Sequence, residues 1–588
     1  MRGSEGPSRP ADRSATHGPE ARIRALLAGG PGPRVVNLVG PVGSGKSAIL
    51  AALADEVTVI DEVNAEADVR ALRLPAGPVL VASRRPLTGY PGWRHPGEVT
   101  VVDVAPWPAD RIRALAAAQG ITDPERQHNT VQLAGGNPLL AAALCRALRA
   151  VPDDDAPGAV VHAAVREVLD RLASETLGVD RALMLVATVG QCDEDLLTQL
   201  GEEYVFGRLL ASSLVVPLAG GLAVVEPFRT VFELALRWRA PVRHRTAQTL
   251  AAAHHNRLML TERDAPARGE RVAQSLFLAV DGPARRLFRP VTAPVRIRRA
   301  EAGDADDIAR LVRRWADLGE FDRTRCGKLL DTWMRAAPEG FHLVRDRDDR
   351  AVGLVTIMPF AERTMAAFEP VLQQHAGVAA DGGALTCLTT YPEHDPAARS
   401  AVFRFLLASS LQHGRLVVTT PSVGYQKLAR RFGFTDHGAL RGDVHGGPVP
   451  CRVFSHDFGA ESLSDWVDGL RGPGLAPVLP ADAAWLIRHL REALEHHDQP
   501  LMLARSPLLA AVGDPAALRA MLVAGVRQLE EAPTAADAEA GRILAQYYLE
   551  RRGGHEFIAH RLHLGRATYF RRLHHGLTLL AAPLVARS

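Results

Sequence analysis

Gly40-Pro-Val-Gly-Ser-Gly-Lys-Ser47 is the stretch that decides the fold at the start of this chain. The apolar run Val35–Val39 before it is typical of a buried strand, and residues 47–54 have the composition of a helix. The stretch therefore matches GxxxxGK[ST] in the strand–loop–helix setting that this motif requires. It predicts a loop that binds the phosphates of a nucleoside triphosphate.

Each type of residue in this loop has an expected role. Glycine lets backbone N–H groups close around phosphates, and the start of the following helix adds partial positive charge. The residues expected to surround ATP or ADP are Gly40, Gly43, Ser44, Gly45, Lys46 and Ser47. Lys46 is expected to pair with the β- and γ-phosphates and Ser47 to ligate Mg²⁺. Lys46 is one of only three lysines in an otherwise arginine-based chain, which supports a site that needs a compact ammonium group.

Two acids end the next predicted strand, Val57-Thr-Val-Ile-Asp-Glu62. At the edge of a sheet beside the loop, Asp61 can hold Mg²⁺ through water and Glu62 can polarise the attacking water. Asp103, at the end of the predicted strand 98–104, is the rival for the Mg²⁺ role. The alternative for Asp61 and Glu62 is a strand that runs into an acidic turn.

A further predicted strand, Pro78-Val-Leu-Val-Ala-Ser-Arg-Arg85, ends in a serine and two arginines. Ser83, Arg84 and Arg85 are placed to sense the γ-phosphate, and the two arginines are the further candidates for a catalytic role beside Glu62. The alternative is a solvated strand end.

Together these motifs resemble the STAND branch of P-loop ATPases, which are signal-transduction relatives of AAA+ proteins. The resemblance covers about residues 20–280 and includes Ala134-Gly-Gly-Asn-Pro-Leu139, which is similar to the family's Gly-x-Pro element. It implies that Pro138 begins a helical lid segment near the base of the nucleotide. Only 15 residues separate Lys46 from Asp61, where the family usually has another strand and helix. We therefore expect a trimmed sheet.

Residues 178–280 are mostly helical in composition, with a β-hairpin predicted over 214–225 around Gly220-Gly221. This pattern resembles the winged-helix module that follows the ATPase in STAND proteins and clamps their ADP-bound state. The family often has a histidine just after the wing, but this chain has Glu226 there. A helical spacer is the alternative.

Residues 294–458 resemble the GNAT acetyltransferase superfamily. The resemblance rests on a strand and acid-capped helix from Val295, a hairpin over 341–358, and Tyr425-Gln-Lys-Leu-Ala-Arg-Arg-Phe-Gly-Phe434. Active members bind the acetyl-CoA pyrophosphate with a glycine-rich loop at a helix N-terminus. The corresponding Glu393-His-Asp-Pro-Ala-Ala-Arg-Ser400 has two acids and no glycine. Arg399 and Tyr425 are the candidate acyl-CoA residues. Acetyl transfer, non-catalytic ligand sensing and scaffolding all stay open, with ligand sensing favoured.

The last residues are strongly basic. Residues 541–588 carry eight arginines against two glutamates. A short helix ending near Leu562, a turn at Leu564-Gly565 and a second helix from Arg566 resemble the helix-turn-helix modules of sigma-factor region 4. Such a fold places the start of its second helix in the major groove of DNA. The residues expected to face DNA are Arg566, Thr568, Tyr569, Arg571 and Arg572. A basic hairpin for protein contacts is the alternative.

The predicted fold class is multidomain α/β and α. It comprises a P-loop parallel-sheet ATPase, a winged helix, a GNAT-like mixed α/β domain and an all-α helix-turn-helix domain. The expected boundaries are 1–19 for a disordered lead-in, 20–150 for the ATPase domain, 151–290 for the helical lid and winged helix, 294–458 for the GNAT-like domain, 459–540 for a helical linker domain and 541–588 for the helix-turn-helix domain.

Bulk properties predict a cytoplasmic protein with no membrane partner. The five cysteines are far apart, with no CxxC pair, and no apolar run is long enough to span a bilayer. The order of modules favours an ATP-dependent transcriptional regulator that responds to a small-molecule or protein effector and forms a homo-oligomer on activation. The alternatives are an ATP-gated N-acetyltransferase and a DNA-associated ATPase of a mobile element or defence system.

Overall fold

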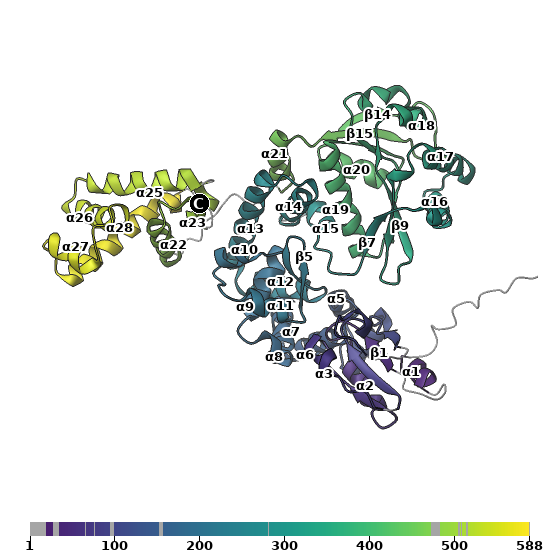
Figure 1. Cartoon of the computed structure of the whole chain (residues 1–588), viewed down its shortest axis with the longest axis horizontal. Coiled ribbons are helices and arrows are strands. Elements are labelled where there is room, and N and C mark those ends of the chain that lie inside the picture. The colour runs from purple at the N-terminus through teal and green to yellow at the C-terminus, as the bar shows by residue number, and fades with distance from the viewer. Residues whose placement is uncertain are drawn as a thin grey trace, which may run out of the picture. The chain divides into compact units, whose positions relative to one another are not determined.

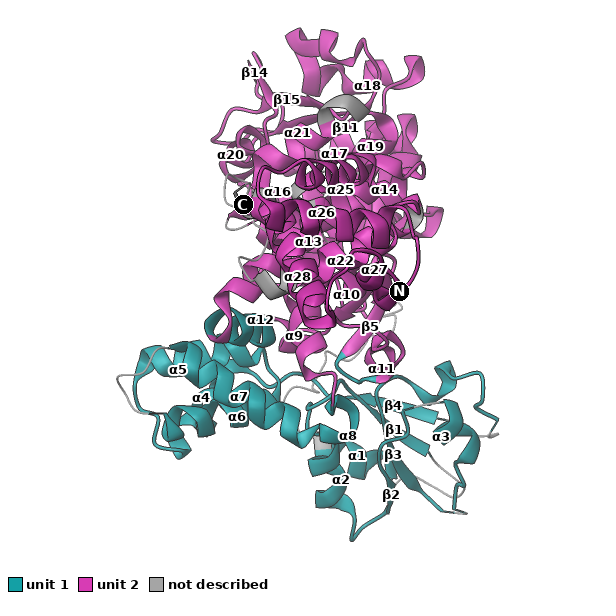
Figure 2. Cartoon of the chain, turned by 90° about the vertical axis from the view of Figure 1, so that its left-hand side faces the viewer, with its two compact units in different colours: residues 1–177, 212–214, 230–238 teal, residues 178–211, 215–229, 239–588 magenta. Residues whose placement is uncertain are grey.

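The computed structural model describes residues 19–27, 35–64, 66–75, 77–94, 99–151, 157–279, 282–471, 483–503, 506, 508–512 and 515–586 (Figure 1). All but one residue of the predicted lead-in, 1–19, lie outside this set. The chain divides into two compact units (Figure 2). One comprises residues 1–177, 212–214 and 230–238, and the other comprises residues 178–211, 215–229 and 239–588. Within the described residues, no helix is both long and apolar enough to cross a bilayer.

The first unit contains a parallel sheet with the strand order β2-β3-β1-β4. The strands are β1 (Val35–Val39), β2 (Thr58–Ile60), β3 (Val79–Ser83) and β4 (Val99–Asp103), and helices α2 (Lys46–Leu53) and α3 (Glu66–Ala71) lie between them in the chain. Every residue of β1 and β3 is buried, as expected for central strands covered on both faces. Leu38 packs toward Ile49 and Leu53, whereas Val81 belongs to a second cluster with Val69.

The other helices of this unit lie before the first strand or after the last one in the chain. They are α1 (Pro19–Leu27), α4 (Ala109–Ala118), α5 (Pro124–Ala134), α6 (Pro138–Ala150), α7 (Pro157–Arg171) and α8 (Ala173–Thr176). The sheet has four strands among the described residues, and only the short strand β2 lies between Lys46 and β3. This agrees with the expectation of a trimmed sheet.

The second unit begins with helices and a two-stranded hairpin. The elements are α9 (Asp180–Val189), α10 (Glu194–Gln199), α11 (Phe206–Ala211), β5 (Val215–Leu218), β6 (Gly221–Val224), α12 (Phe228–Arg239, which crosses the unit boundary), α13 (Pro241–Thr261), α14 (Ala265–Phe277) and α15 (Pro283–Leu287). The hairpin turns at the predicted glycines, and Gly221 has a φ of +127°. Its Cβ would lie 2.6 Å from the Cys192 carbonyl, so only glycine fits.

A mixed α/β region follows. Its strands are β7 (Arg296–Arg299), β8 (Phe341–Arg345), β9 (Ala351–Thr356), β10 (Met358–Pro359), β11 (Ala384–Thr386), β12 (Thr389–Thr390), β13 (Arg415–Thr420), β14 (Thr435–Ala439) and β15 (Arg452–Asp457). They form one sheet of order β12-β9-β8-β7 and another of order β10-β11-β13-β15-β14. The helices are α16 (Ala305–Leu318), α17 (Arg323–Ala336), α18 (Glu362–Leu372), α19 (Pro396–His413), α20 (Val423–Arg431) and α21 (Ala460–Arg471).

The described residues after 482 are helical. The elements are α22 (Ala483–Glu495), α23 (Pro500–Leu503), α24 (Leu509–Val512), α25 (Pro515–Glu530), α26 (Ala535–Leu544), a π-helical turn (Ala545–Leu549), α27 (His555–Arg561) and α28 (Arg566–Ala586). Their shared core includes Leu518, Ile543, Ile558 and Leu577. The protein is therefore a multidomain chain of mixed α/β and α structure.

Candidate functional site

The predicted phosphate loop joins β1 to α2. Gly43 and Gly45 have φ angles of +71° and +94°, a region that side chains disfavour. A Cβ on Gly43 would lie 2.8 Å from the Asn137 side-chain oxygen. The Ser44 hydroxyl is buried in the loop and has no hydrogen-bond partner among the described residues. This glycine-lined cradle with an unpaired donor fits the phosphates of a nucleotide.

Lys46 turns back onto its own loop. Its Nζ donates to the carbonyl oxygens of Gly40, at 2.8 Å, and Pro41, at 2.9 Å. Burial and, to a smaller extent, the nearby charge of Arg84 lower the pKa of Lys46 to about 8, although Asp61 and Glu62 oppose the shift. The structure thus brings Arg84, Asp61 and Glu62 into electrostatic range of Lys46.

The sheet order explains this convergence. β1 lies between β3 and β4, and β2 lies on the other side of β3, all parallel. Their carboxyl ends therefore share the edge from which the loop leaves β1, which is where ligands bind in open parallel sheets. Asp61 and Glu62 follow β2 and are both exposed. Asp103 ends β4, opposite Val39 of β1.

The two predicted arginines have different surroundings. Arg84 forms an ion pair with Glu175 of α8 at 2.6 Å, and the other oxygen of Glu175 accepts the Ser213 N–H at 2.7 Å. Arg85 instead lies over the ring of Tyr90, 3.9 Å from its centroid. The charge of Arg84 also acts on Lys46.

The predicted Gly-x-Pro element packs directly on the phosphate loop. The Asn137 side chain caps α6 by accepting the Leu140 N–H and donates to the Val42 carbonyl at 2.9 Å. Pro138 lies beside Gly45, 3.8 Å from the position of a Cβ there. Sequence reasoning named Pro138 but missed Asn137 and Glu175. An asparagine immediately before a helix-starting proline is a capping signal that could have identified Asn137.

A Mg²⁺ ion would depend on the nucleotide in this site. No group of three or more His, Cys, Asp or Glu side chains in the described part of the chain is placed to hold a metal. Mg²⁺ in nucleotide sites takes one or two protein ligands plus phosphate oxygens and waters. Ser47, at the start of α2 and exposed, and Asp61 are the residues that fit this role.

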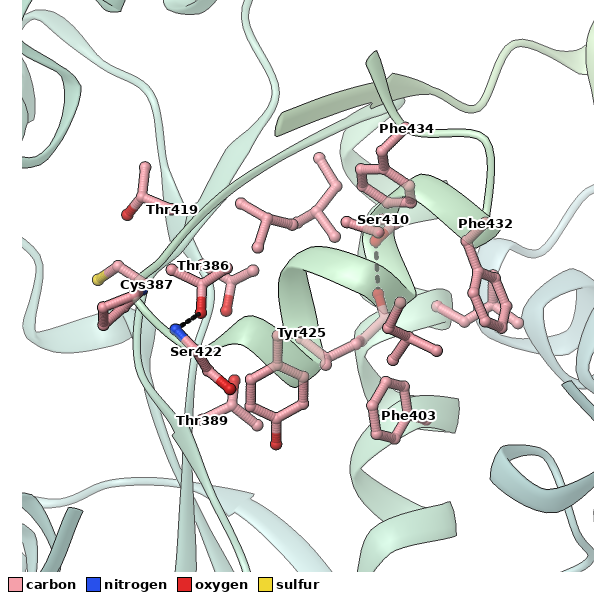
Figure 3. Close-up of a pocket in the computed structure, with 18 of the residues that line it drawn as sticks. Thr386, Cys387, Thr389, Phe403, Ser410, Thr419, Ser422, Tyr425, Phe432 and Phe434 are labelled. Carbon is pink, nitrogen blue, oxygen red and sulfur yellow. Dashed lines mark hydrogen bonds between the residues drawn. The ribbon is translucent and has the colours of Figure 1, made fainter. Parts of the chain in front are cut away.

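A second candidate site opens within the α/β region. β11 pairs with β13 in parallel until Thr386 and Val418, after which the chain pairs through β12 with β9 while β13 continues to Thr420. The two strands separate there, and Figure 3 shows side chains from them facing α20 and α19 across a cavity. Tyr425, near the start of α20, lines this cavity and donates its hydroxyl to that of Tyr391 at 3.2 Å.

The surroundings of Tyr425 are those of a protonated phenol. Burial raises the pKa of Tyr425 far above its ordinary value and also raises that of Tyr391. Arg399 is half-buried, and its charge acts on both tyrosines in the opposite direction. The structure therefore places the two candidate acyl-CoA residues, Arg399 and Tyr425, near each other.

The start of α19 is already capped by a carboxylate. Oδ1 of Asp395 accepts the N–H groups of Ala397, at 2.9 Å, and Ala398, at 3.1 Å. These are the amides that a pyrophosphate would need at this helix end. Asp395 therefore competes with an anion both by charge and by occupying the donors.

The C-terminal candidates divide into exposed and buried residues. Arg566 and Arg571 are exposed, Thr568 is half-buried, and Nε of Arg572 donates to Glu539 at 3.2 Å. Tyr569 is fully buried and hydrogen-bonds to Nδ1 of His555 at 3.0 Å. This position corrects the expectation for Tyr569, because a core side chain cannot reach a base edge.

No protein-family model matches this chain, and neither does any curated protein sequence. Among solved structures, it is similar to the C-terminal condensation domain of Ebony in complex with β-alanyl-dopamine, with 13% identity over 28% of this chain and 100% of that one and a TM-score of 0.22. It is also similar to a signal-transduction ATPase with numerous domains (STAND) that carries a tetratricopeptide-repeat sensor, from Pyrococcus horikoshii. That match has 10% identity over 95% of this chain and 96% of that one, with a TM-score of 0.19. Both likenesses are distant, so the proposals below rest on this chain's own residues.

Proposed function

We propose that this protein is an ATP-dependent regulatory switch of the STAND type that binds DNA through its C-terminal helices. The observation that carries the nucleotide role is the convergence of Lys46, Arg84, Asp61 and Glu62 at one edge of the parallel sheet, beside a glycine cradle. ATP or ADP would bind with Mg²⁺ held by Ser47 and Asp61, and Glu62 would orient water for slow hydrolysis.

The nucleotide role has a direct test by calorimetric titration of ATP and Mg²⁺ into the purified full-length protein. Lys46→Ala removes the only predicted phosphate-binding ammonium and should abolish measurable binding. Lys328→Ala is the matched control, because Lys328 is an exposed lysine on α17. Normal ATP binding by Lys46→Ala would refute the nucleotide site.

The DNA role rests on the exposed arginines at the start of α28. Arg566 and Arg571 would contact phosphates and bases, with Thr568 and Arg572 at the margin. The logarithm of the DNA-binding constant should fall linearly with the logarithm of salt concentration. Arg566→Ala combined with Arg571→Ala should reduce this slope by about 2, because each of the two arginines would neutralise one phosphate. Arg519→Ala, an exposed arginine on α25, should leave the slope unchanged.

Two outcomes of the same mobility-shift titrations would change this assignment. An absence of binding at low salt, unaffected by the double variant, would refute the DNA role. Non-specific binding together with DNA-stimulated ATP turnover would favour a mobile-element or defence ATPase over a transcriptional regulator. Sedimentation with ATP would test the proposed homo-oligomer.

For the α/β region we propose a ligand-sensing role rather than catalysis. The capped start of α19 carries this choice, because Asp395 holds the amides that coenzyme A would use. One observation favours the alternative of an N-acetyltransferase. Tyr425 lines the cavity as a protonated phenol, which is the form that a general acid requires. Transfer of radiolabel from acetyl-CoA to an acceptor, lost in Tyr425→Phe, would establish that alternative.

A further inference from the structure

The cavity between β11 and β13 has walls that are almost entirely apolar. Aromatic rings from Phe403 of α19 and from Phe432 and Phe434 after α20 line it, and Figure 3 shows them on the opposite side of the view from Thr386 and Thr419. Val418 of β13 and Leu428 of α20 also line the cavity and are half-buried. No charged side chain belongs to the described residues that line the cavity.

The cavity has a volume of about 140 Å³. A cavity of roughly 150 Å³ lined by apolar side chains binds benzene and stays free of water. The space here therefore suits one aromatic ring or a branched aliphatic group of similar size. Its uncharged walls exclude an ionised group, because burying an unpaired charge is strongly unfavourable.

Two hydroxyl groups give the cavity a polar feature. Oγ1 of Thr386 on β11 and Oγ1 of Thr419 on β13 are buried, and neither has a hydrogen-bond partner among the described residues. The exposed fractions of these residues are only 5% and 1%. Both residues line the cavity. Neither oxygen is exposed to the cavity as the side chains now lie, so the threonine must turn about its Cα–Cβ bond before a ligand with a donor or acceptor can pair with it.

This pairing of shape and polarity is typical of small-molecule sites, which combine apolar walls with a few placed polar groups. We propose that the cavity binds a small uncharged molecule, or an uncharged end of one, made of a single ring or branched aliphatic body with one hydrogen-bonding group. The site is separate from the nucleotide loop. Only the use of binding as a regulatory signal rests on the proposed function.

Coenzyme A derivatives are the competing ligand for this place in the fold. Their pyrophosphate needs free amides or positive charge at the start of α19, where Asp395 already accepts both available N–H groups. The inferred ligand therefore enters without a nucleotide or phosphate attached. This distinction gives the experiment its two arms.

The test uses p-cresol, which is uncharged at pH 7, titrated into the full-length protein by calorimetry, with acetyl-CoA as the second arm. One p-cresol should bind per chain, and acetyl-CoA should neither bind nor displace it. Ala429→Phe fills the cavity from α20 and should weaken p-cresol binding by more than 10-fold. Thr419→Val removes one hydroxyl without changing volume and should weaken binding roughly 3- to 10-fold. Thr188→Val is the control, since the Thr188 hydroxyl is satisfied by Met184 on α9.

A comparison with toluene gives a second test that does not depend on the folding of Ala429→Phe. Toluene lacks the hydroxyl, so the wild-type preference for p-cresol over toluene should shrink in Thr419→Val while toluene binding persists. Three results would each overturn the proposal. They are displacement of p-cresol by acetyl-CoA, an unchanged preference for p-cresol over toluene in the double variant Thr419→Val/Thr386→Val, and the absence of p-cresol binding. Lys46→Ala should bind p-cresol normally, so failure of the nucleotide site can be told apart from failure of this one.

Discussion

Lys46 shows how a single residue ties the structure of the loop to its chemistry. Burial lowers its pKa to about 8, so the free protein loses the ammonium charge as the pH rises through 8. Bound phosphates favour the charged form, and binding above pH 8 must therefore take up a proton. We predict that ATP affinity falls between pH 7.5 and pH 9.5. Calorimetry in buffers of different ionisation enthalpy should show proton uptake that increases over this range.

Lys46→Arg provides the control for this pH dependence. A guanidinium stays charged throughout the range, although it does not reproduce the compact ammonium. Its residual ATP affinity should be weak but nearly constant with pH. An equally steep fall in Lys46→Arg would assign the pH dependence to another group.

Glu175 holds the one arginine that the structure associates with Lys46. Its ion pair with Arg84 is less than one-third exposed, and an ATP γ-phosphate would compete for the same guanidinium. We predict that Glu175→Gln tightens ATP binding about 2- to 5-fold, in line with the modest strength of such pairs. Arg84→Ala should weaken binding, and the double variant should resemble Arg84→Ala. Glu167→Gln, which weakens ion pairs with Arg146 on α6 and Arg171 on α7, should leave ATP affinity unchanged.

At the residue scale, local motifs were predictable and distant partners were not. The loop residues and Pro138 follow from contiguous patterns in the sequence. Glu175 lies 91 residues after Arg84, and no local pattern links the two. The place of Tyr569 near the start of a helix predicts contact with DNA. The spacing of Tyr569, Leu573 and Leu577 at every fourth position is instead that of a buried helix face.

At the scale of elements, the sequence was most informative where strands are continuous and apolar. β1 and β3 were predicted within a residue or two because buried parallel strands read as unbroken apolar runs. The division between β11 and β12 was not predictable. It depends on β13 and β9, which pair with segments far away in the chain. The cavity between β11 and β13 could therefore not be predicted from the sequence.

The cap of α19 offers a test of how one helix end selects ligands. Asp395→Ala should cost about 1 kcal/mol of stability through loss of the cap, measured by the denaturation midpoint. It should also free two amides and remove a negative charge, so measurable coenzyme A binding is expected to appear. Asp322→Ala is a matched control, because Asp322 caps α17 with the same two-bond geometry. It should lose similar stability and gain no affinity for coenzyme A.

For the whole molecule, the joint between the helices and the α/β region lies at α14 and α19. These helices approach closely, and a Cβ on Gly269 would lie 2.9 Å from Cα of Ala408. Arg404 of α19 pairs with Glu270 of α14 at 2.8 Å and donates to the carbonyls of Phe288 and Arg289. Burial would raise the pKa of Glu270, but Arg404 and the hydrogen bonds of Gln274 and Gln191 outweigh it and keep the pKa low.

The position of Phe288 connects this joint to the cavity. Phe288 lines the cavity, and its ring lies 6.1 Å from that of Phe432 and 6.5 Å from that of Phe403. A ligand that orders Phe288 would therefore act on the segment whose carbonyls Arg404 binds. The sequence could not indicate this connection, since Glu270 and Arg404 are 134 residues apart.

Breaking the joint should destabilise the protein in a way that depends on which partner is removed. Arg404→Met leaves the Glu270 carboxylate buried without its cation, and we predict a loss of about 3–5 kcal/mol in the free energy of unfolding. Arg404→Met combined with Glu270→Met should be less damaging than Arg404→Met alone, because no buried charge is left unpaired. Urea denaturation followed by circular dichroism measures the free energy of unfolding of both variants.

The same measurement tests whether the joint transmits ligand binding. If it does, p-cresol should stabilise Arg404→Met less than it stabilises the wild type. Equal losses in the single and double variants would show that the ion pair does not set the stability of this joint.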